Sequence, residues 1–452
     1  MPTSDIHIVM AAVPAYGHVR PMRSLASSLT ERGYPVTFIT GRSFRRSLEA
    51  IKGVEFIELH GKADIDVARL NELFPERSKL PKNGMGFLWD LEHVFFAALP
   101  DQHEALQHVL KRTDLAHKKV VVLADATFGG TIPMLLDSPD TRRVPVVGLG
   151  NFPLAVTSKD TAPFGMGLPS QGPEKNMELN AQVTQMMGGV QAFVKRVLEP
   201  YQCTKPVPGT QPLDLWCNVQ DIYCQLCVPA LEPPRSDLPK HIRFLGTLLG
   251  ANDKKPPPEW FDSFVVNGET NTPLVMVTSG TLPDMDPHEL IIPTVDACRD
   301  LPVRLVICAV HASRPADLVL PDNARWAEWI SFEDLFKYTD IAVSNGGYGG
   351  INQAFASGIP MIVAGMTEDK AETTARAEMT GAAINLKCQT PTSEQVREAL
   401  EKVLKDGMYK QKALDLKTAY AECDAVGSFV QAIDEMAKKF YGVADGQVNG
   451  HA

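Results

Sequence analysis

The chain has 452 residues, of which 44% are hydrophobic and 22% charged, and its formal net charge is −10. This length is about three times that of a typical domain, so we expect two large domains. The composition is typical of a soluble globular protein, and the acidic charge disfavours a nucleic-acid partner. No apolar run is long enough to span a bilayer, and the first lacks a signal-peptide cleavage pattern, so we expect a cytoplasmic protein without a membrane span.

The first predicted strand covers residues 6–13, an apolar run rich in β-branched residues that is typical of a buried parallel strand. Apolar residues then recur at helical spacing from Pro21 to Leu29, and the proline suits a first turn. His18 is therefore predicted on the loop after the first strand, at the sheet edge where open α/β sheets bind ligands. A solvated loop histidine is the alternative at this point.

The first half of the chain continues with alternating strand and helix patterns, which predict a mostly parallel sheet with helices on both faces. Further strands are expected at residues 35–40, 54–59, 119–124 and 144–149. Residues 61–99 are more irregular and rich in aromatic side chains. That stretch fits either a plain core or the apolar wall of a ligand site.

A break in the pattern follows at residues 251–259, where charged residues precede a proline triplet that is typical of a stiff linker. Strand patterns then resume at residues 273–278, 303–308, 341–344 and 360–364. We predict a first domain over residues 1–245, a linker over 246–260 and a second domain over 261–425. A C-terminal helix over 426–441 is expected to pack back on the first domain, before a flexible tail at 442–452.

Two local motifs have spacings that occur in functional sites. The eight cysteines do not suggest a disulfide framework, and we interpret Cys224 and Cys227, a lone C-x-x-C pair in a predicted strand, as core residues. The segment SNGGYGGINQA at residues 344–354 follows a strand and opens a helix, where free backbone N–H groups suit a diphosphate. A glycine-rich turn needed only for packing is the alternative. The first strand is not followed by the G-x-G-x-x-G pattern, which disfavours an oxidoreductase.

Three segments resemble the family 1 glycosyltransferases of the GT-B fold, which are UDP-sugar-dependent enzymes that glycosylate small molecules. They are GHVRPMRSLASSLTERGYPVTFITG, VMVTSGT and WISFEDLFKYTDIAVSNGGYGGINQAFASGIPMIVAGMTEDKAE. The resemblance covers nearly the whole chain and implies an α/β fold of two doubly wound Rossmann-like domains that face each other across a cleft. It also implies inverting transfer of a sugar, expected to be glucose, from a UDP-sugar to a hydroxyl group, or alternatively an aromatic carbon, of a small apolar or phenolic acceptor.

The resemblance implies catalytic roles for His18 and Asp125. In the family, a histidine at this position takes the proton from the acceptor hydroxyl, and an aspartate at the end of a later strand orients that histidine. An imidazole with a near-neutral pKa is a suitable general base, and a carboxylate partner fixes its tautomer. A structural cap at the end of the strand is the alternative role of Asp125.

The resemblance also implies a donor site in the second domain. Trp329 matches the tryptophan that stacks on uracil, with Trp326 as its rival, and Asp369 matches the carboxylate that holds sugar hydroxyls. The other donor-binding positions are Gly17, Gly280, Thr281, Asn345, Gly346, Gly347, Gly349, Gly350, Gln353 and Lys370.

Several positions of the second domain depart from the family pattern, among them Ser331 and Phe332, which replace Pro-Gln. Asn345 replaces a phosphate-contacting histidine, Gln353 a ribose-binding glutamate, and Lys370 a glutamine. These side chains still form hydrogen bonds, but their changed charge leaves the preferred base and sugar open. The rival hypothesis is a nucleotide-sugar-binding protein of the same fold with lapsed or different chemistry.

The acceptor is expected to contact Met85, Phe87, Trp89 and Phe152, with Phe164 as a further candidate. Two D-x-D triplets, at residues 64–66 and 284–286, have the spacing of metal-dependent glycosyltransferases of another fold, but neither lies in that fold's context. We therefore expect no metal and no cofactor, and the sequence does not indicate an oligomeric state.

Overall fold

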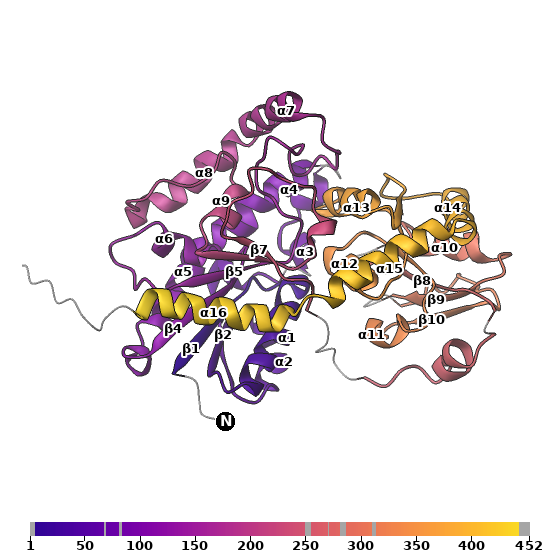
Figure 1. Cartoon of the computed structure of the whole chain (residues 1–452), viewed down its shortest axis with the longest axis horizontal. Helices are drawn as coiled ribbons and strands as arrows, with labels where there is room; N and C mark the ends of the chain where they lie inside the picture. The colour runs from indigo at the N-terminus through magenta and orange to yellow at the C-terminus, as the bar shows by residue number, and fades with distance from the viewer. Residues whose placement is uncertain are drawn as a thin grey trace, which may run out of the picture.

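A computed structural model of the chain describes residues 5–66, 69–80, 84–248, 255–269, 271–280, 286–309 and 313–442. It consists of two α/β domains side by side, each built on a parallel sheet that is flanked by helices (Figure 1). This architecture confirms the predicted fold class. Among the described helices, none is both long and apolar enough to cross a membrane.

Both sheets are parallel throughout. In spatial order, the N-terminal sheet consists of β3 (Val54–Glu58), β2 (Val36–Thr40), β1 (Ile6–Ala11), β4 (Lys119–Asp125), β5 (Val146–Gly150), β6 (Ile222–Gln225) and β7 (Ile242–Phe244). The C-terminal sheet consists of β10 (Ala324–Ala327), β9 (Arg304–Cys308), β8 (Leu274–Thr278), β11 (Ile341–Ser344), β12 (Met361–Val363) and β13 (Ala383–Asn385).

The helices connect these strands and cover both faces of each sheet. Those of the N-terminal domain are α1 (Tyr16–Glu31), α2 (Arg45–Glu49), α3 (Leu70–Leu73), α4 (Gly84–Asp90), α5 (Leu99–Leu110), α6 (Ile132–Leu135), α7 (Pro173–Met186), α8 (Gly188–Leu198) and α9 (Asp214–Asn218). The later helices are α10 (Ile291–Cys298), α11 (Phe332–Leu335), α12 (Tyr348–Ala356), α13 (Lys370–Met379), α14 (Ser393–Lys405), α15 (Gly407–Ala421) and α16 (Ala425–Tyr441).

The central strand β1 is apolar along its whole length because both of its faces are covered. Ile8 and Met10 pack with residues of α1 and α16 in one core cluster. Val9 and Ala11, which point to the opposite face, pack with residues of α5 in another. Such double burial explains the continuous hydrophobic run that identified this strand in the sequence.

Each sheet has a switch point, where the strand order reverses direction. In the N-terminal sheet it lies between β1 and β4, and in the C-terminal sheet between β8 and β11. Loops that leave the carboxyl ends of two such strands run to opposite sides and leave a crevice, which is where open α/β sheets bind ligands. Ligand sites are therefore expected at the two switch points.

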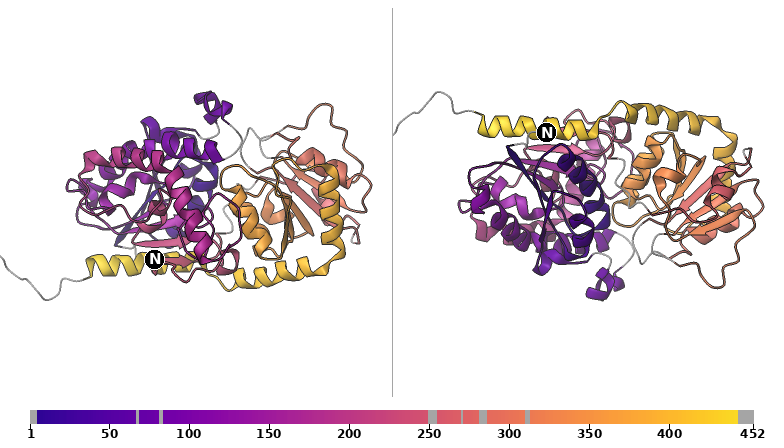
Figure 2. Two further views of the ribbon diagram at one scale, coloured as in Figure 1. Left: turned by 90° about the horizontal axis from the view of Figure 1, so that it is seen from above. Right: turned by 90° about the horizontal axis from the view of Figure 1, so that it is seen from below.

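The last described helix returns to the first domain. Helix α15 lies on the C-terminal domain, and α16 then runs along the N-terminal domain, as the yellow helix shows in both views of Figure 2. Phe429, Ile433 and Met436 are buried in the same core cluster as β1 and α1. The Arg243 guanidinium donates two hydrogen bonds of 2.8 Å to the Glu435 carboxylate beside this contact.

Candidate active site

His18 lies in the first turn of α1, which begins at Tyr16, and the loop position predicted for it is wrong. Pro21 lies inside the helix rather than at its start. Proline has no N–H for the carbonyl four residues earlier, so the Gly17 carbonyl lacks that helical partner. It accepts instead a hydrogen bond of 3.5 Å from Nδ2 of Asn151, which follows β5.

The His18 imidazole and the Asp125 carboxylate meet at the N-terminal switch point. His18 follows β1, Asp125 is the last residue of β4, and these two strands are neighbours in the sheet. Nδ1 of His18 lies 3.0 Å from both carboxylate oxygens. Asp125 is fully buried, whereas 21% of the His18 side chain is exposed. Within the described ranges, no residue forms a hydrogen bond with Nε2 of His18.

Asp125 is itself held by its neighbours. The Thr127 hydroxyl donates a hydrogen bond of 2.7 Å to Oδ2, and the backbone N–H of Val13 donates one of 3.4 Å to the same atom. These donors fix the carboxylate, and the carboxylate in turn fixes the imidazole with Nδ1–H as the donor. The arrangement leaves Nε2 as the proton acceptor of the neutral ring.

The pKa of His18 is raised above its ordinary value. Burial opposes the charged ring, but the charge of Asp125, its hydrogen bond and the charge of Asp369 together outweigh burial. Asp369 belongs to the C-terminal domain, so residues of both domains act on the pKa of His18. Burial raises the pKa of the Asp369 carboxyl to about 6.

The C-terminal switch point brings Asn345 beside the segment that follows β8. Nδ2 of Asn345 donates to the Ser279 carbonyl, while its Oδ1 is buried without a partner among the described residues. Gly280 has φ of +88°, and a Cβ there would lie 2.9 Å from Asn345 Nδ2. Gly346 has φ of +85° and would place a Cβ 2.4 Å from the Thr374 side chain, so only glycine fits at either position.

Helix α12 starts directly after this turn, with Gly347 as its N-cap residue. No atom lies within 4 Å of a Cβ built at Gly349 or Gly350, and the same is true of Gly17 at the start of α1. The first N–H groups of a helix have no helical partner and favour anions. One turn on, Gln353 Oε1 accepts a hydrogen bond of 3.5 Å from Arg20 Nη2 of the N-terminal domain.

Lys370 follows Asp369 as the first residue of α13. Its ammonium pairs with Glu368 and donates a hydrogen bond of 3.2 Å to the Thr367 hydroxyl. Burial lowers its pKa to about 8. The Lys370 ammonium thus interacts with two residues of the loop that directly precedes α13.

The two candidate stacking tryptophans have different surroundings. Trp326 lies within β10 and packs against the C-terminal core, with its indole N–H buried. Trp329 is half-buried just beyond β10, and the Lys255 ammonium lies 5.6 Å from its ring centroid. Thr281, the other predicted contact near the base and diphosphate, lies outside the described residues.

Replacing Trp329 with alanine is expected to weaken UDP binding by about tenfold or more, because base stacking on an aromatic ring is lost. Isothermal titration calorimetry with UDP measures the effect. Trp326→Ala is the matched comparison, and we expect it to lower the melting temperature because it removes a core side chain. Unchanged UDP affinity in Trp329→Ala would transfer the stacking role to Trp326.

The predicted acceptor residues separate into two aromatic groups. Phe152 lies 6.4 Å from Phe164, and Phe164 lies 6.3 Å from Phe87, as measured between ring centroids. Trp216, which the sequence analysis missed, joins this group 5.8 Å from Phe152.

Trp89 belongs to the second group. It stacks on His93 with centroids 4.2 Å apart and contacts Phe74 at 5.3 Å. Among the described rings, no contact joins it to Phe152, so the structure does not bring these two predicted acceptor residues together. The side chain of Met85 lies outside what the structure describes.

The structure also describes most of the acidic and cysteine motifs that have the spacing of metal sites. In the described part of the chain, no group of three or more His, Cys, Asp or Glu side chains is placed to hold a metal ion. Asp64 accepts a hydrogen bond of 2.9 Å from the Arg42 backbone, and Asp284 lies outside the described residues. Cys224 and Cys227 are buried free thiols in different core clusters.

Comparison with known proteins fits this geometry. Residues 293–434 match the family model of the erythromycin biosynthesis protein CIII-like C-terminal domain. The chain is 40% identical to UDP-glycosyltransferase 2 of Phaeomoniella chlamydospora over 96% of both chains, and 29% identical to UDP-glucosyltransferase A1 of Starmerella bombicola over 98% of this chain and 95% of that one. The crystal structure of CalG4, the calicheamicin glycosyltransferase, matches with a TM-score of 0.70 at 19% identity, over 98% of this chain and 100% of that chain.

The fold is therefore that of the GT-B glycosyltransferases. Because it is 40% identical to a UDP-glycosyltransferase over 96% of both chains, the chain belongs to the UDP-glycosyltransferase family and is a glycosyltransferase. The family resemblance of its motifs is confirmed.

Proposed function

We propose that the protein transfers glucose from UDP-glucose to a hydroxyl group of a small apolar or phenolic acceptor, with inversion at the anomeric carbon. The contact between His18 and Asp125 carries the proposal, because it supplies a general base at a sheet edge suited to ligands. The relatives named above are a UDP-glycosyltransferase and a UDP-glucosyltransferase, which supports a uridine donor that carries glucose.

In the proposed reaction, Nε2 of His18 accepts the proton of the acceptor hydroxyl as its oxygen attacks the anomeric carbon. The bond from that carbon to the UDP oxygen breaks on the opposite face, and UDP leaves with the electron pair. The imidazolium that forms is stabilised by the Asp125 carboxylate and by the charge of Asp369. Release of the proton to solvent restores the base.

On the donor side, we assign the diphosphate to the start of α12, where Gly347, Gly349 and Gly350 offer backbone N–H groups. These donors would stabilise the charge that develops on UDP as it leaves. Asp369 is assigned to the sugar hydroxyls, since its charge already acts on His18. We further propose that turnover needs no bound metal.

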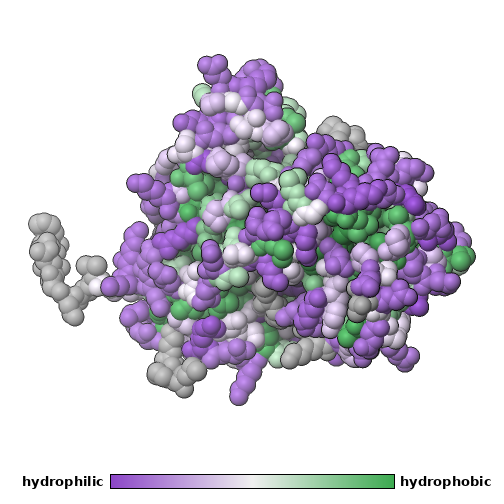
Figure 3. Space-filling view, turned by 45° about the vertical axis from the view of Figure 1, so that its right-hand side comes forward, coloured by the Kyte–Doolittle hydropathy of each residue, from purple (hydrophilic) through white to green (hydrophobic). Residues whose placement is uncertain are grey.

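The acceptor class is supported by the aromatic group of Phe87, Phe152, Phe164 and Trp216. Aromatic side chains contribute large apolar contact areas and favour flat or hydrophobic partners. Figure 3 shows hydrophilic side chains over most of one face of the molecule, with hydrophobic ones interspersed. We accordingly assign the apolar acceptor to the aromatic group rather than to this outer surface.

Thermal unfolding with UDP, TDP, UDP-glucose, UDP-N-acetylglucosamine, NADH and ATP tests the donor site. UDP and UDP-glucose are expected to raise the melting temperature by several degrees at saturation, since a ligand that binds only the folded state stabilises it by mass action. The shift is expected to be equal with magnesium and with EDTA. A shift produced only by NADH, or by no nucleotide, would contradict the donor assignment.

Product analysis tests the transfer itself. UDP-glucose is incubated with 4-methylumbelliferone, as a phenol, or farnesol, as an apolar alcohol, and the products are analysed by mass spectrometry. A mass gain of one glucosyl group that is lost on acid hydrolysis supports O-glucosylation, whereas an acid-stable product indicates attack by carbon. Binding of UDP-glucose without transfer to any acceptor of a broader phenol and alcohol panel would favour a lapsed enzyme.

A further inference from the structure

Helix α13 contacts the N-terminal domain one turn after Asp369, the residue assigned to the sugar. Oε1 of Glu372 accepts hydrogen bonds from the backbone N–H groups of Gly165, at 2.9 Å, and Gly167, at 2.7 Å. Glu372 is itself fixed to the start of the helix, since its N–H donates to the Asp369 carbonyl at 3.1 Å. The acidic side chain therefore ties a loop of one domain to the donor end of the other.

The loop backbone is shaped for this contact. Gly165 and Gly167 have φ of +95° and +60°, in the region that favours glycine. A Cβ at Gly167 would lie 2.7 Å from the backbone carbonyl oxygen of Ala371 on α13, so a side chain there would force the two segments apart. The loop thus approaches the helix as closely as backbone allows.

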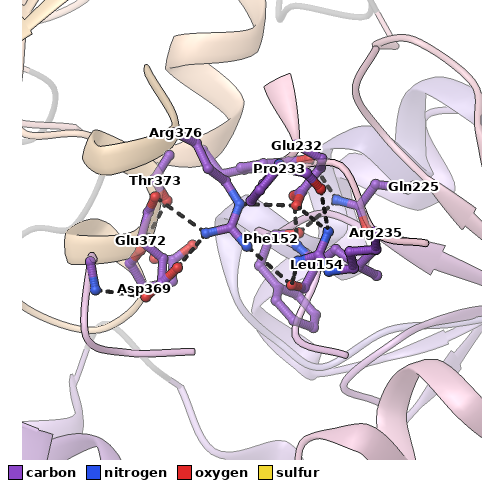
Figure 4. A network of polar contacts seen from close by, with 12 residues as sticks. Phe152, Leu154, Gln225, Glu232, Pro233, Arg235, Asp369, Glu372, Thr373 and Arg376 are labelled. Atoms are coloured by element: carbon purple, nitrogen blue, oxygen red, sulfur yellow. Dashed lines mark hydrogen bonds and ion pairs between the residues drawn. The ribbon is translucent and has the colours of Figure 1, made fainter. Parts of the chain in front are cut away.

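Arg376, one further turn along α13, extends the contact (Figure 4). Its guanidinium pairs with Glu372, lies 3.0 Å from Oε2 of Glu232 in the N-terminal domain, and donates a hydrogen bond of 3.1 Å to the Leu154 carbonyl. Glu232 completes the link by accepting from the Leu154 N–H at 2.8 Å. With Arg235 paired to Glu232 at 3.1 Å, the buried side chains of two arginines balance those of two glutamates.

The segment that these groups hold, residues 152–167, carries two of the acceptor-side aromatic residues. Phe152 begins it, and Phe164 lies directly before Gly165. A second link reaches the same segment from α12: Gln225 Nε2 contacts both the Phe152 carbonyl, at 2.7 Å, and the Tyr348 hydroxyl, at 2.6 Å. Helix α13 therefore contacts this segment directly, and α12 contacts it through Gln225 of β6.

We propose that Glu372 and Arg376 are positioning residues that set segment 152–167, and with it the acceptor, relative to the sugar held at the start of α13. The inference rests on the proposed function for its catalytic meaning. Asp369 and Glu372 belong to one rigid helical turn, so the sugar contact and the acceptor segment keep a fixed separation. A displacement of about 1 Å between reacting groups is enough to cost a large factor in rate.

Glu372→Gln tests the proposal, because it removes the charge that Gly165, Gly167 and Arg376 share while keeping the side-chain size. We expect the acceptor kcat/KM to fall about tenfold, mainly through kcat, with UDP affinity within about twofold of wild type. Gly167→Ala displaces the same segment from its own side and is expected to give the same pattern. Glu378→Gln is the matched control, since Glu378 lies on α13 but pairs with Lys387 of its own domain.

Hydrogen exchange of the ligand-free protein gives a readout that does not depend on activity. Amides of residues 152–167 are expected to exchange faster in Glu372→Gln than in wild type, and those of the two sheets at an unchanged rate. Unaltered exchange in the segment, or a kcat for the acceptor equal to that of wild type, would overturn the positioning role. If wild type itself transfers no sugar, the proposed function fails, and the exchange experiment still decides whether Glu372 holds the segment.

Discussion

His18→Ala is expected to lower glucosyl transfer to a hydroxyl acceptor by about a hundredfold or more, because the reaction loses its general base. UDP affinity is expected to stay close to that of wild type, since the nucleotide is assigned to the start of α12 in the other domain. Steady-state kinetics with 4-methylumbelliferone and calorimetry with UDP measure the two quantities.

His60→Ala is a suitable control for this variant. Its side chain is 78% exposed, and it lies near Glu58 rather than in the site. We expect wild-type kinetics from it. Transfer by His18→Ala at the wild-type rate would remove His18 from the mechanism while leaving the family assignment intact.

Asp125→Asn is expected to lower transfer by a factor on the order of a hundred or more, because an amide neither fixes the imidazole tautomer nor stabilises the imidazolium. Thr127 and Val13 both donate to Oδ2 of the carboxylate, so an amide nitrogen at that position would meet both donors. Measurement of the melting temperature separates this catalytic loss from a loss of stability. A rate within about threefold of wild type would contradict the orienting role.

The same variant makes a prediction about pH. In wild type the pKa of His18 is raised, so the neutral base accumulates only as pH rises through a value above the ordinary 6.5. Asp369, with a pKa of about 6, is ionised before that point. The acid limb of kcat/KM is therefore expected above pH 6.5, and Asp125→Asn is expected to move it to lower pH. An acid limb at the same pH in both proteins would assign it to another group.

The strands could be predicted where both faces of the sheet are covered, because burial on both sides demands a continuous apolar run. Strands β7, β10 and β13 were missed, since each is a short strand at the edge of its sheet with partly exposed positions, so no continuous apolar run marks it. The start of α1 was placed too late because proline usually marks a first turn. Here Pro21 is accommodated inside the helix while Asn151 contacts the freed carbonyl.

The candidate site was predictable only in part. Sequence patterns placed His18 after one predicted strand and Asp125 at the end of another, and the family resemblance paired them. The adjacency of β1 and β4, which brings the two side chains together, is seen only in the structure. The aromatic partners depend on side-chain packing that no local pattern encodes, so Trp216 was missed and Trp89 was grouped with Phe152. Their proposed roles in binding stay predictions. The link from Glu372 to Gly165 joins residues 207 positions apart and leaves no signal in the sequence.

The return of α16 has a consequence for the order in which the molecule acquires its structure on the ribosome. Phe429, Ile433 and Met436 complete the same core cluster as β1, yet they follow the entire C-terminal domain in the chain. The N-terminal sheet is therefore synthesised long before the helix that covers part of it. Until translation reaches that helix, the nascent domain exposes an apolar surface, which is the kind of surface that chaperones shield from aggregation.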